Sequence, residues 1–360
     1  MTSSRPLVRR DISMLQLRLW EFTGTAFVNL FVFLLLLMYL SPLSYTLVSS
    51  LENDSQFLET NPPIWPANVV TYTYQGQVEE IYNVPMPDGV RQLALVKALP
   101  TKADFIDPKA PQAGLIHWQG SWRTLRKVYV PSITFNNFIR AWQGNDYLRF
   151  FGNTVFVGLV SGIGVLCSSI AVAYGMSRFR IPGGGLLFLL IIATIMIPDS
   201  ILIVPSFYMY VRLLPDITHI QWYGNYLPLV VPSFFGSAVY IFLLRQKFKS
   251  IPRDLDEAAM LDGAGPLRIL VSIILPQSIP VVTTVALLHF FNTWNELRLS
   301  SLYLSIHPER QLMAFSIQTT GGSPAALQTD TLFFILIPVI VLLVSQRFFM
   351  QDMIVTGIEK

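Results

Sequence analysis

Four polar side chains, His289, Asn292, Thr293 and Glu296, recur in an otherwise apolar stretch of the chain. Their spacing of i, i+3, i+4 and i+7 predicts that they share one face of a helix. Polar groups inside a membrane are costly and usually face a bundle interior or a wet cavity. Two interpretations stay open. The four residues line a wet cavity, or they form interhelical hydrogen bonds, with Glu296 at a helix end near the membrane interface.

A fifth polar residue, Asp199, interrupts the apolar run 181–211 directly after Pro198. An ionisable group at such a depth favours a functional role. The alternative is that Asp199 or Ser200 caps the helix that resumes after the proline and satisfies its freed N–H groups.

Catalytic chemistry has no support in the sequence. The chain contains no G-x4-G-K-[ST] motif, no paired carboxylates within an apolar run, and only scattered histidines. The single cysteine, Cys167, excludes an internal disulfide. A formal net charge of +3 is too small to suggest nucleic-acid binding. We therefore expect no enzyme, no metal site, and no nucleotide bound by this chain itself.

The elements that carry these residues are membrane helices. Of the 360 residues, 52% are hydrophobic and only 13% are charged, whereas soluble domains carry about a quarter charged residues. Crossing a membrane takes about 18 or more apolar residues. The spans predicted on this basis are 22–51, 150–177, 181–211, 217–244, 269–288 and 331–346, the last extended through Phe348, Phe349 and Met350 past a snorkelling Arg347. The first run is longer than a signal-peptide core of about 7–15 residues and reads as a retained anchor.

Basic residues orient the chain. Four arginines precede the first span, two arginines lie between the second and third spans, and five basic residues lie between the fourth and fifth, whereas the opposite side carries few. By the positive-inside rule both termini and the loop 245–276 are cytoplasmic. We expect an all-α polytopic protein with about six transmembrane helices. Its expected parts are an arm (1–21), helix 1 (22–51), an external insert with its linker (52–149), a core (150–351) and a tail (352–360).

The insert differs from the rest of the chain. β-branched and aromatic runs at 69–74, 78–84, 90–96 and 115–130 alternate with turn signals at 75–76, 85–89 and 107–111. This pattern predicts a small β-rich subdomain between helices 1 and 2.

The cytoplasmic loop contains a further set of residues at fixed spacing. Ser250 and Pro252 resemble a helix start, three acids follow in the first turn, and the helix should stop at Gly263, with Pro266 opening the next one. The set comprises Glu257, Ala258, Ala259, Gly263, Ile273, Leu275 and Pro276.

This set matches E-A-A-x3-G-x9-I-x-L-P at every fixed position, and the chain here resembles the EAA loop of ABC-importer permeases. The resemblance implies that the short helix docks in a cleft of a cytoplasmic ATPase. Glu257 would be its polar anchor, the two alanines would permit close approach, and Gly263 would supply the bend. It also implies that the polar residues of the spans, Asp199 among them, are candidates for the translocation path.

Within these permeases the maltose-type, carbohydrate branch is suggested by three smaller motifs: Asn153-Thr154, the Met196-Ile197-Pro198 and Ile203-Val204-Pro205 pair, and Trp294-Asn295-Glu296. The tail Gly357-Ile358-Glu359-Lys360 only approximates the family's usual ending. The implied partners are a second permease subunit, two copies of an ATPase that binds ATP and Mg, an external substrate-binding protein and the lipid bilayer of a bacterial-type plasma membrane.

Three other hypotheses stay open. The solute could be a peptide, a polyamine or a phosphate ester in place of a sugar. An ion-driven secondary transporter would show internal repeats and buried coupling carboxylates, for which Asp199 is the only strong candidate. A membrane-anchored sensor would use the β-rich insert and would not require an EAA loop.

Overall fold

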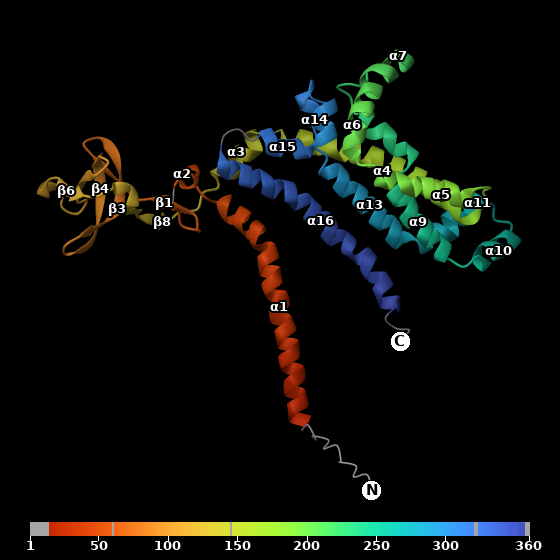
Figure 1. Ribbon diagram of the computed structural model, residues 1–360, viewed down its shortest axis with the longest axis horizontal. Coiled ribbons are helices and arrows are strands. Elements are labelled where there is room, and N and C mark those ends of the chain that lie inside the picture. Colours follow the sequence, from red (N-terminus) through yellow and green to blue (C-terminus); the bar gives the residue numbers. More distant parts are fainter. Residues whose placement is uncertain (1–13, 60, 145, 320–322, 357–360) are drawn as a thin grey trace, which may run out of the picture. The chain divides into compact units, whose positions relative to one another are not determined.

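The computed structural model describes residues 14–59, 61–144, 146–319 and 323–356. Most of the predicted N-terminal arm and the residues Gly357 to Lys360 lie outside these ranges. The chain divides into two compact units, Met1–Phe135 and Asn136–Lys360 (Figure 1). The fold class predicted from the sequence is confirmed, because the described chain is mostly helical and a small β-rich insert follows the first helix.

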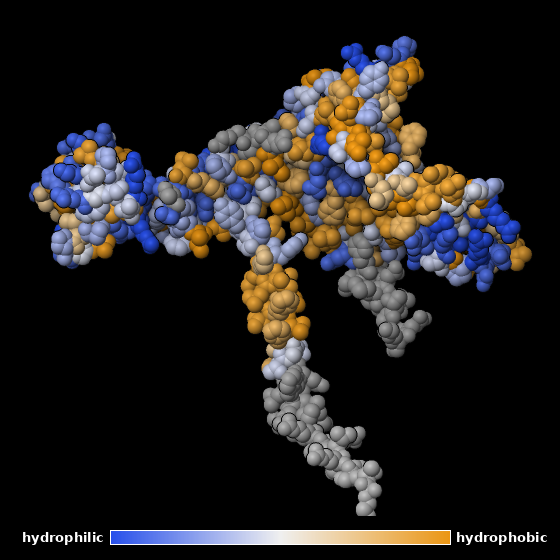
Figure 2. All heavy atoms as spheres, viewed as in Figure 1, coloured by the Kyte–Doolittle hydropathy of each residue, from blue (hydrophilic) through white to orange (hydrophobic). Residues whose placement is uncertain are grey.

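Helix α1 (Met14–Ser49) in the first unit is a candidate membrane span. It exposes large apolar side chains along most of its described length (Figure 2), and Phe22–Ser50 is long and apolar enough to cross a bilayer. The hydroxyls of Ser41, Ser44 and Thr46 donate to carbonyls three or four residues earlier in the helix. Because the helix supplies acceptors for its own hydroxyls, these residues need no partner in lipid.

The β subdomain, residues 52–131, follows α1 and includes the short helix α2 (Asp54–Phe57) near its start. Its main sheet has the order β2-β3-β4-β5-β6 with β7 also paired to β3, its small sheet pairs β1 with β8, and all pairs are antiparallel. The strands are β1 (Ala67–Val69), β2 (Thr71–Tyr74), β3 (Gln77–Met86), β4 (Gly89–Ala98), β5 (Lys102–Ile106), β6 (Ile116–Gln119), β7 (Arg126–Lys127) and β8 (Tyr129–Pro131).

The first three predicted strand regions are present, but one strand was missed and one predicted strand is corrected. Strand β5 was not predicted from the sequence. The predicted continuous run 115–130 is three short strands, because Gly120 takes a positive φ of 151° and Trp122–Thr124 form the 3-10 turn η2. The pleat then buries alternate residues on opposite faces: Tyr82 packs with Leu93 and Phe105, whereas Ile81 packs with Ala94 and Ile106.

The second unit is helical. Its elements in chain order are α3 (Asn136–Gly144), α4 (Tyr147–Arg178), α5 (Gly184–Ala193), η3 (Thr194–Met196), α6 (Asp199–Tyr208), η4 (Met209–Leu213), α7 (Leu214–Thr218), α8 (Leu227–Val230), η5 (Val231–Phe235), α9 (Ala238–Ser250), α10 (Asp254–Leu261), α11 (Pro266–Ile269), η6 (Leu270–Ile274), α12 (Leu275–Gln277), α13 (Ile279–Trp294), α14 (Arg298–Tyr303), η7 (Pro308–Arg310), α15 (Met313–Thr319) and α16 (Pro324–Thr356).

Across the described residues, five helical segments are long and apolar enough to span a membrane, and a bent pair provides a sixth. The predicted third span is broken at Ile197, because Pro198 cannot continue the helix. The predicted fourth span begins later than expected, at Leu227, and runs to Ser250. The fifth bends by 82° between Pro266–Gln277 and Ile279–Trp294.

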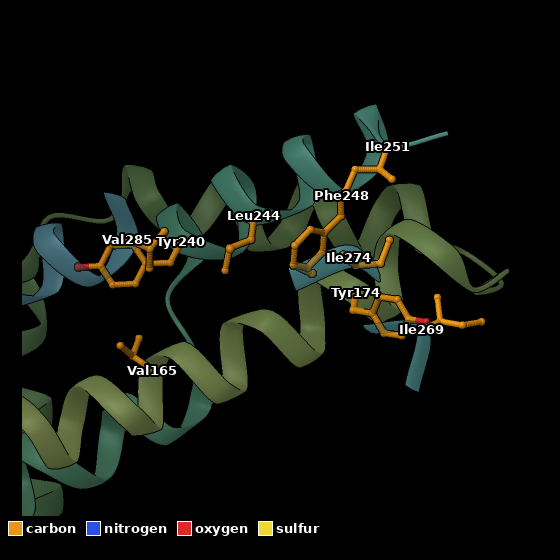
Figure 3. Packing of buried hydrophobic residues seen from close by; sticks show 10 residues of the cluster. Val165, Tyr174, Tyr240, Leu244, Phe248, Ile251, Ile269, Ile274 and Val285 are labelled. Carbon is orange, nitrogen blue, oxygen red and sulfur yellow. The ribbon is translucent and has the colours of Figure 1, made fainter. Parts of the chain in front are cut away.

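The core of this unit lies between α4, α9 and the 266–285 segment. Figure 3 shows its buried residues, with Phe248 of α9 beside Ile274 of η6 and Tyr174 of α4 in one cluster. Because α4 packs on α9, η5, α13 and α15, it can position groups at both of its ends.

Candidate functional site

The loop helix α10 starts later than its sequence suggests. Ser250 is the last residue of α9 and its hydroxyl donates to the Lys247 carbonyl at 2.8 Å, so the prediction that Ser250 caps the loop helix is wrong. The reason is tertiary: Phe248 and Ile251 are buried in the core and hold α9 helical to that point. Helix α10 begins at Asp254, with its acids in the first turn as predicted.

The predicted stop at Gly263 is confirmed in detail. Gly263 takes a φ of 80°, its N–H donates to the Met260 carbonyl at 3.0 Å, and the Ala264 N–H donates to the Ala259 carbonyl at 2.9 Å. These two bonds form a Schellman motif, which needs a left-handed residue at the glycine position. Pro266 then opens α11, also as predicted.

The two alanines of the motif face different surroundings. Ala259 packs against the buried cluster of the core, whereas Glu257 and Ala258 are exposed. Leu261 is 90% exposed, and Leu267 of α11 is 74% exposed. The exposed surface of α10 and α11 therefore combines these apolar side chains with carboxylates, among them Glu257 and Asp254, and it lies at the end of the unit that Figure 2 colours largely blue.

The ends of this surface are fastened to α4. The Arg178 Nε lies 2.8 Å from the Asp256 Oδ2, and both side chains are more than nine-tenths buried. Arg178 also donates to the Ile251 carbonyl at 3.1 Å, and the Tyr174 hydroxyl donates to the Pro266 carbonyl at 2.9 Å. Helix α10 is thus connected on both sides to the C-terminal end of one long membrane helix.

The last three motif residues shape the entry to α13. Ile273 and Leu275 pack on the core, whereas Pro276 is exposed on α12. The π turn η6 precedes Pro276, and the chain bends at Ser278 before α13 begins. Proline removes an N–H from the helix ladder, so a widened turn and a bend are expected beside it.

The structure brings the three polar residues of α13, and Glu296 just after its end, together with residues of α4 and α9. His289 Nε2 lies 2.8 Å from the Ser161 hydroxyl, and the Asn292 amide donates to the Tyr240 hydroxyl at 3.1 Å. His289, Asn292, Thr293 and Glu296 all line one cavity of about 150 Å³. Both interpretations of these residues gain support, because the side chains share a cavity and also bond between helices.

Glu296 and Asp199 lie at the rim of this region. Glu296 follows the end of α13, and its Oε1 accepts the Leu299 N–H at 2.7 Å, which caps α14. Asp199 opens α6, and its carboxylate lies 3.8 Å from an Arg298 nitrogen and is 82% exposed. Within the described residues Asp199 makes no hydrogen bond to a backbone N–H, so the capping interpretation gains no support. It is not part of the His289 cavity.

Several contributing residues were missed by the sequence analysis. Ser161 lines the cavity, Tyr240 accepts a hydrogen bond from Asn292, and Arg178 was counted only as a loop charge. The Asn153-Thr154 pair has a structural role: Asn153 donates to the carbonyls of Glu309 and Gln311, and the Thr154 hydroxyl accepts the Met313 N–H at 2.7 Å. The sequence signal that could have identified Ser161 and Thr154 as contact residues is a serine or threonine within a predicted apolar span.

The geometry of the loop and core has counterparts in known proteins. The family model described as "Binding-protein-dependent transport system inner membrane component" matches residues 163–360, more than half of the chain. The chain belongs to this family. It is therefore a multi-pass inner-membrane permease component of a bacterial ABC importer.

Relatives in this permease family cover different shares of the chain. The probable ABC transporter permease protein YurM of Bacillus subtilis is 30% identical over 195 residues, which are 54% of this chain and 61% of YurM. The osmoprotective compounds uptake permease protein GgtD of Synechocystis is 22% identical over 284 residues, 77% of this chain and 92% of GgtD. The arabinooligosaccharides transport permease AraQ of Halalkalibacterium halodurans is 27% identical over 237 residues, 64% of this chain and 82% of AraQ.

The fold of the permease also matches a solved structure. A bacterial ABC transporter that imports the acidic polysaccharide alginate contains a chain that superimposes with a TM-score of 0.59 at 18% identity. The match covers 95% of this chain and 100% of the other.

Proposed function

We propose that this permease passes a sugar or sugar-like solute from an external binding protein across the inner membrane. It would pair with a second permease subunit and two copies of an ATPase, which would bind ATP and Mg in place of this chain. Support for the solute class comes from relatives named for arabinooligosaccharides, alpha-glucosides and diacetylchitobiose.

The observation that carries the proposal is the exposed outer surface of α10 together with its attachment to α4. Glu257 and Ala258 are free to contact another chain, whereas Asp256 and Ala259 on the opposite side are held by the core. A helix that is bound on one side and exposed on the other can transmit a displacement from a partner into its own subunit.

The route from this surface to the cavity runs along a single helix, α4. Displacement of α10 acts on Arg178 and Tyr174 at one end of α4, and Ser161 farther along the same helix contacts His289. Closure of the ATPases would draw the loop helices of the two permease subunits together and open the path outward. ATP hydrolysis would then reset it inward.

The test compares two exposed acids in the first turn of α10. Glu257→Gln should abolish solute-stimulated ATPase activity in the reconstituted complex while leaving complex assembly intact. Asp254→Asn, the matched control, removes the same charge from the same turn and should retain most of the activity. Equal activity of Glu257→Gln and the wild type, or equal loss in both variants, contradicts the coupling role.

A second variant tests the bend. No atom lies within 4 Å of a Cβ added at Gly263, so Gly263→Ala acts through its strained positive φ alone. We expect lower stimulation with normal assembly, since the Schellman motif would no longer hold α10 at its present angle.

A further inference from the structure

The β subdomain contains a cavity of about 820 Å³ that the transport mechanism does not use. It lies between loop residues 58–59 and 61–65, the turn η2 and the strands β3, β7 and β8. Its volume falls in the range of about 300–1,000 Å³ that is usual for small-molecule sites. The lining residues used below are Asn61, Trp65, Asn83, Trp122, Arg123 and Arg126.

The loop that forms one wall is held in place by a buried amide. Gln56 is 2% exposed, and its Nε2 donates to the carbonyls of Pro63 and Trp65, both at 2.9 Å. Its Oε1 accepts the Ala67 N–H at 2.9 Å. Ordering a loop costs conformational entropy, and a preordered wall spares that cost when a ligand binds.

A charged group ties the same wall to the sheet. Lys127 donates to Glu59 at 2.6 Å and to Glu80 at 2.9 Å. Burial disfavours the ammonium, but these two carboxylates outweigh it and raise the pKa of Lys127. The ammonium of Lys127 therefore stays charged, the two carboxylates balance its charge, and the lysine positions the wall.

The two arginines of the cavity, Arg123 and Arg126, differ from Lys127 in their pairing. Within the part of the chain that the structure describes, neither Arg123 nor Arg126 has an ion-pair partner, and the Arg123 guanidinium lies 5.3 Å from the centre of the Trp122 ring. Planar guanidinium groups recognise carboxylates bidentately. The cavity therefore has a surplus of positive charge suited to a planar anion.

The remaining lining favours a sugar over an acidic peptide. Side-chain amides offer both donors and acceptors to hydroxyl groups, and the Trp65 and Trp122 rings offer apolar faces. A peptide that added as a strand would need a free strand edge, but at Tyr82 and Asn83 strand β3 is paired on both sides, with β4 and with β7.

We propose that this cavity binds an acidic saccharide, a sugar ring that carries a carboxylate. Arg123 and Arg126 hold the carboxylate, Asn61 and Asn83 bond the hydroxyls, and the tryptophans cover the apolar face of the ring. The site goes beyond the proposed transport function, because it does not require that the ligand be the transported solute.

The test uses the purified full chain in nanodiscs, without ATPase or binding protein, and follows tryptophan fluorescence. Galacturonate should give a saturable change, and galactose, its neutral match, should bind about tenfold more weakly, since a charge-assisted hydrogen bond contributes at least that factor. Arg123→Gln should weaken galacturonate binding by a similar factor with an unchanged circular dichroism spectrum. Arg91→Gln, which removes an arginine paired with Asp88 outside the cavity, should bind normally.

Three outcomes would overturn the inference: equal binding of both sugars, an equal loss in Arg91→Gln, or no saturation with galacturonate at millimolar concentrations. The Glu257→Gln variant separates this site from the transport proposal. It should bind galacturonate normally whether or not coupling is lost, so each proposal can fail by itself.

Discussion

The buried ion pair between Arg178 and Asp256 is the residue contact that most directly links the loop to the membrane core. Both charges are taken out of water, and the Asp256 Oδ1 has no hydrogen-bond partner among the described residues. Pairs with this geometry contribute little net stability, because desolvation offsets the attraction. We infer that the pair fixes the position of α10 against α4.

Breaking one side of this pair gives the first prediction. Asp256→Asn leaves the Arg178 charge buried and unpaired, which should lower the free energy of unfolding by about 3–5 kcal/mol. The double variant Arg178→Met with Asp256→Leu should recover most of the thermal stability, because the charge is gone, and yet restore little ATPase stimulation. Thermal unfolding and ATPase assays of the same preparations check both parts. Full recovery of ATPase stimulation in the double variant would show that the position of α10 against α4 does not depend on the ion pair.

At the scale of elements, α4 depends on close approach by its neighbours. A Cβ added at Gly164 would lie 2.7 Å from the Phe234 ring of η5, whereas a Cβ at Gly175 of the same helix meets no atom within 4 Å. The two positions therefore form a matched pair for a single methyl group.

We expect alanine at these two positions to change the free energy of unfolding in opposite directions. Gly164→Ala should destabilise the chain by about 1–3 kcal/mol through overpacking. Gly175→Ala should stabilise it by up to about 1 kcal/mol, because alanine loses less conformational entropy than glycine when the helix forms. Thermal unfolding of the two variants beside the wild type measures the difference, and similar midpoints for both would contradict the packing.

The elements also show which features sequence can predict. The stop at Gly263 and the start at Pro266 were predicted because local backbone preferences decide them. The start of α10 was not, since tertiary burial of Phe248 extends α9. The π turns η4 and η6 were missed although each directly precedes a Leu-Pro pair, at Pro215 and Pro276. Partners such as Ser161 for His289 lie 128 residues apart in sequence and required the fold.

For the whole molecule, the spans of the helical unit divide into inner and outer ones. In Tyr147–Arg178 and Leu227–Ser250, 28% of the apolar window is buried, but in Asp199–Thr218 none is. Val204 of α6 is 76% exposed, for example. We expect the surface of α6 to be covered by lipid or by the second permease subunit, while α4 and α9 form the inner pair.

The orientation of the chain is a prediction that its charges make and that labelling can test. Five basic residues lie at the end of α9, in the loop after it and at the start of the bent pair, namely Arg245, Lys247, Lys249, Arg253 and Arg268, compared with two, Arg298 and Arg310, in the segment after α13. Because positive loops stay in the cytoplasm, this loop should be internal and the β subdomain external. Cys167 is the single cysteine, so Cys167→Ser gives a background without thiols. In it, Gln112→Cys should react with an impermeant maleimide in spheroplasts, and Lys249→Cys should react only in inside-out vesicles. The reverse pattern would place α10 outside the cell, where no ATPase could reach Glu257.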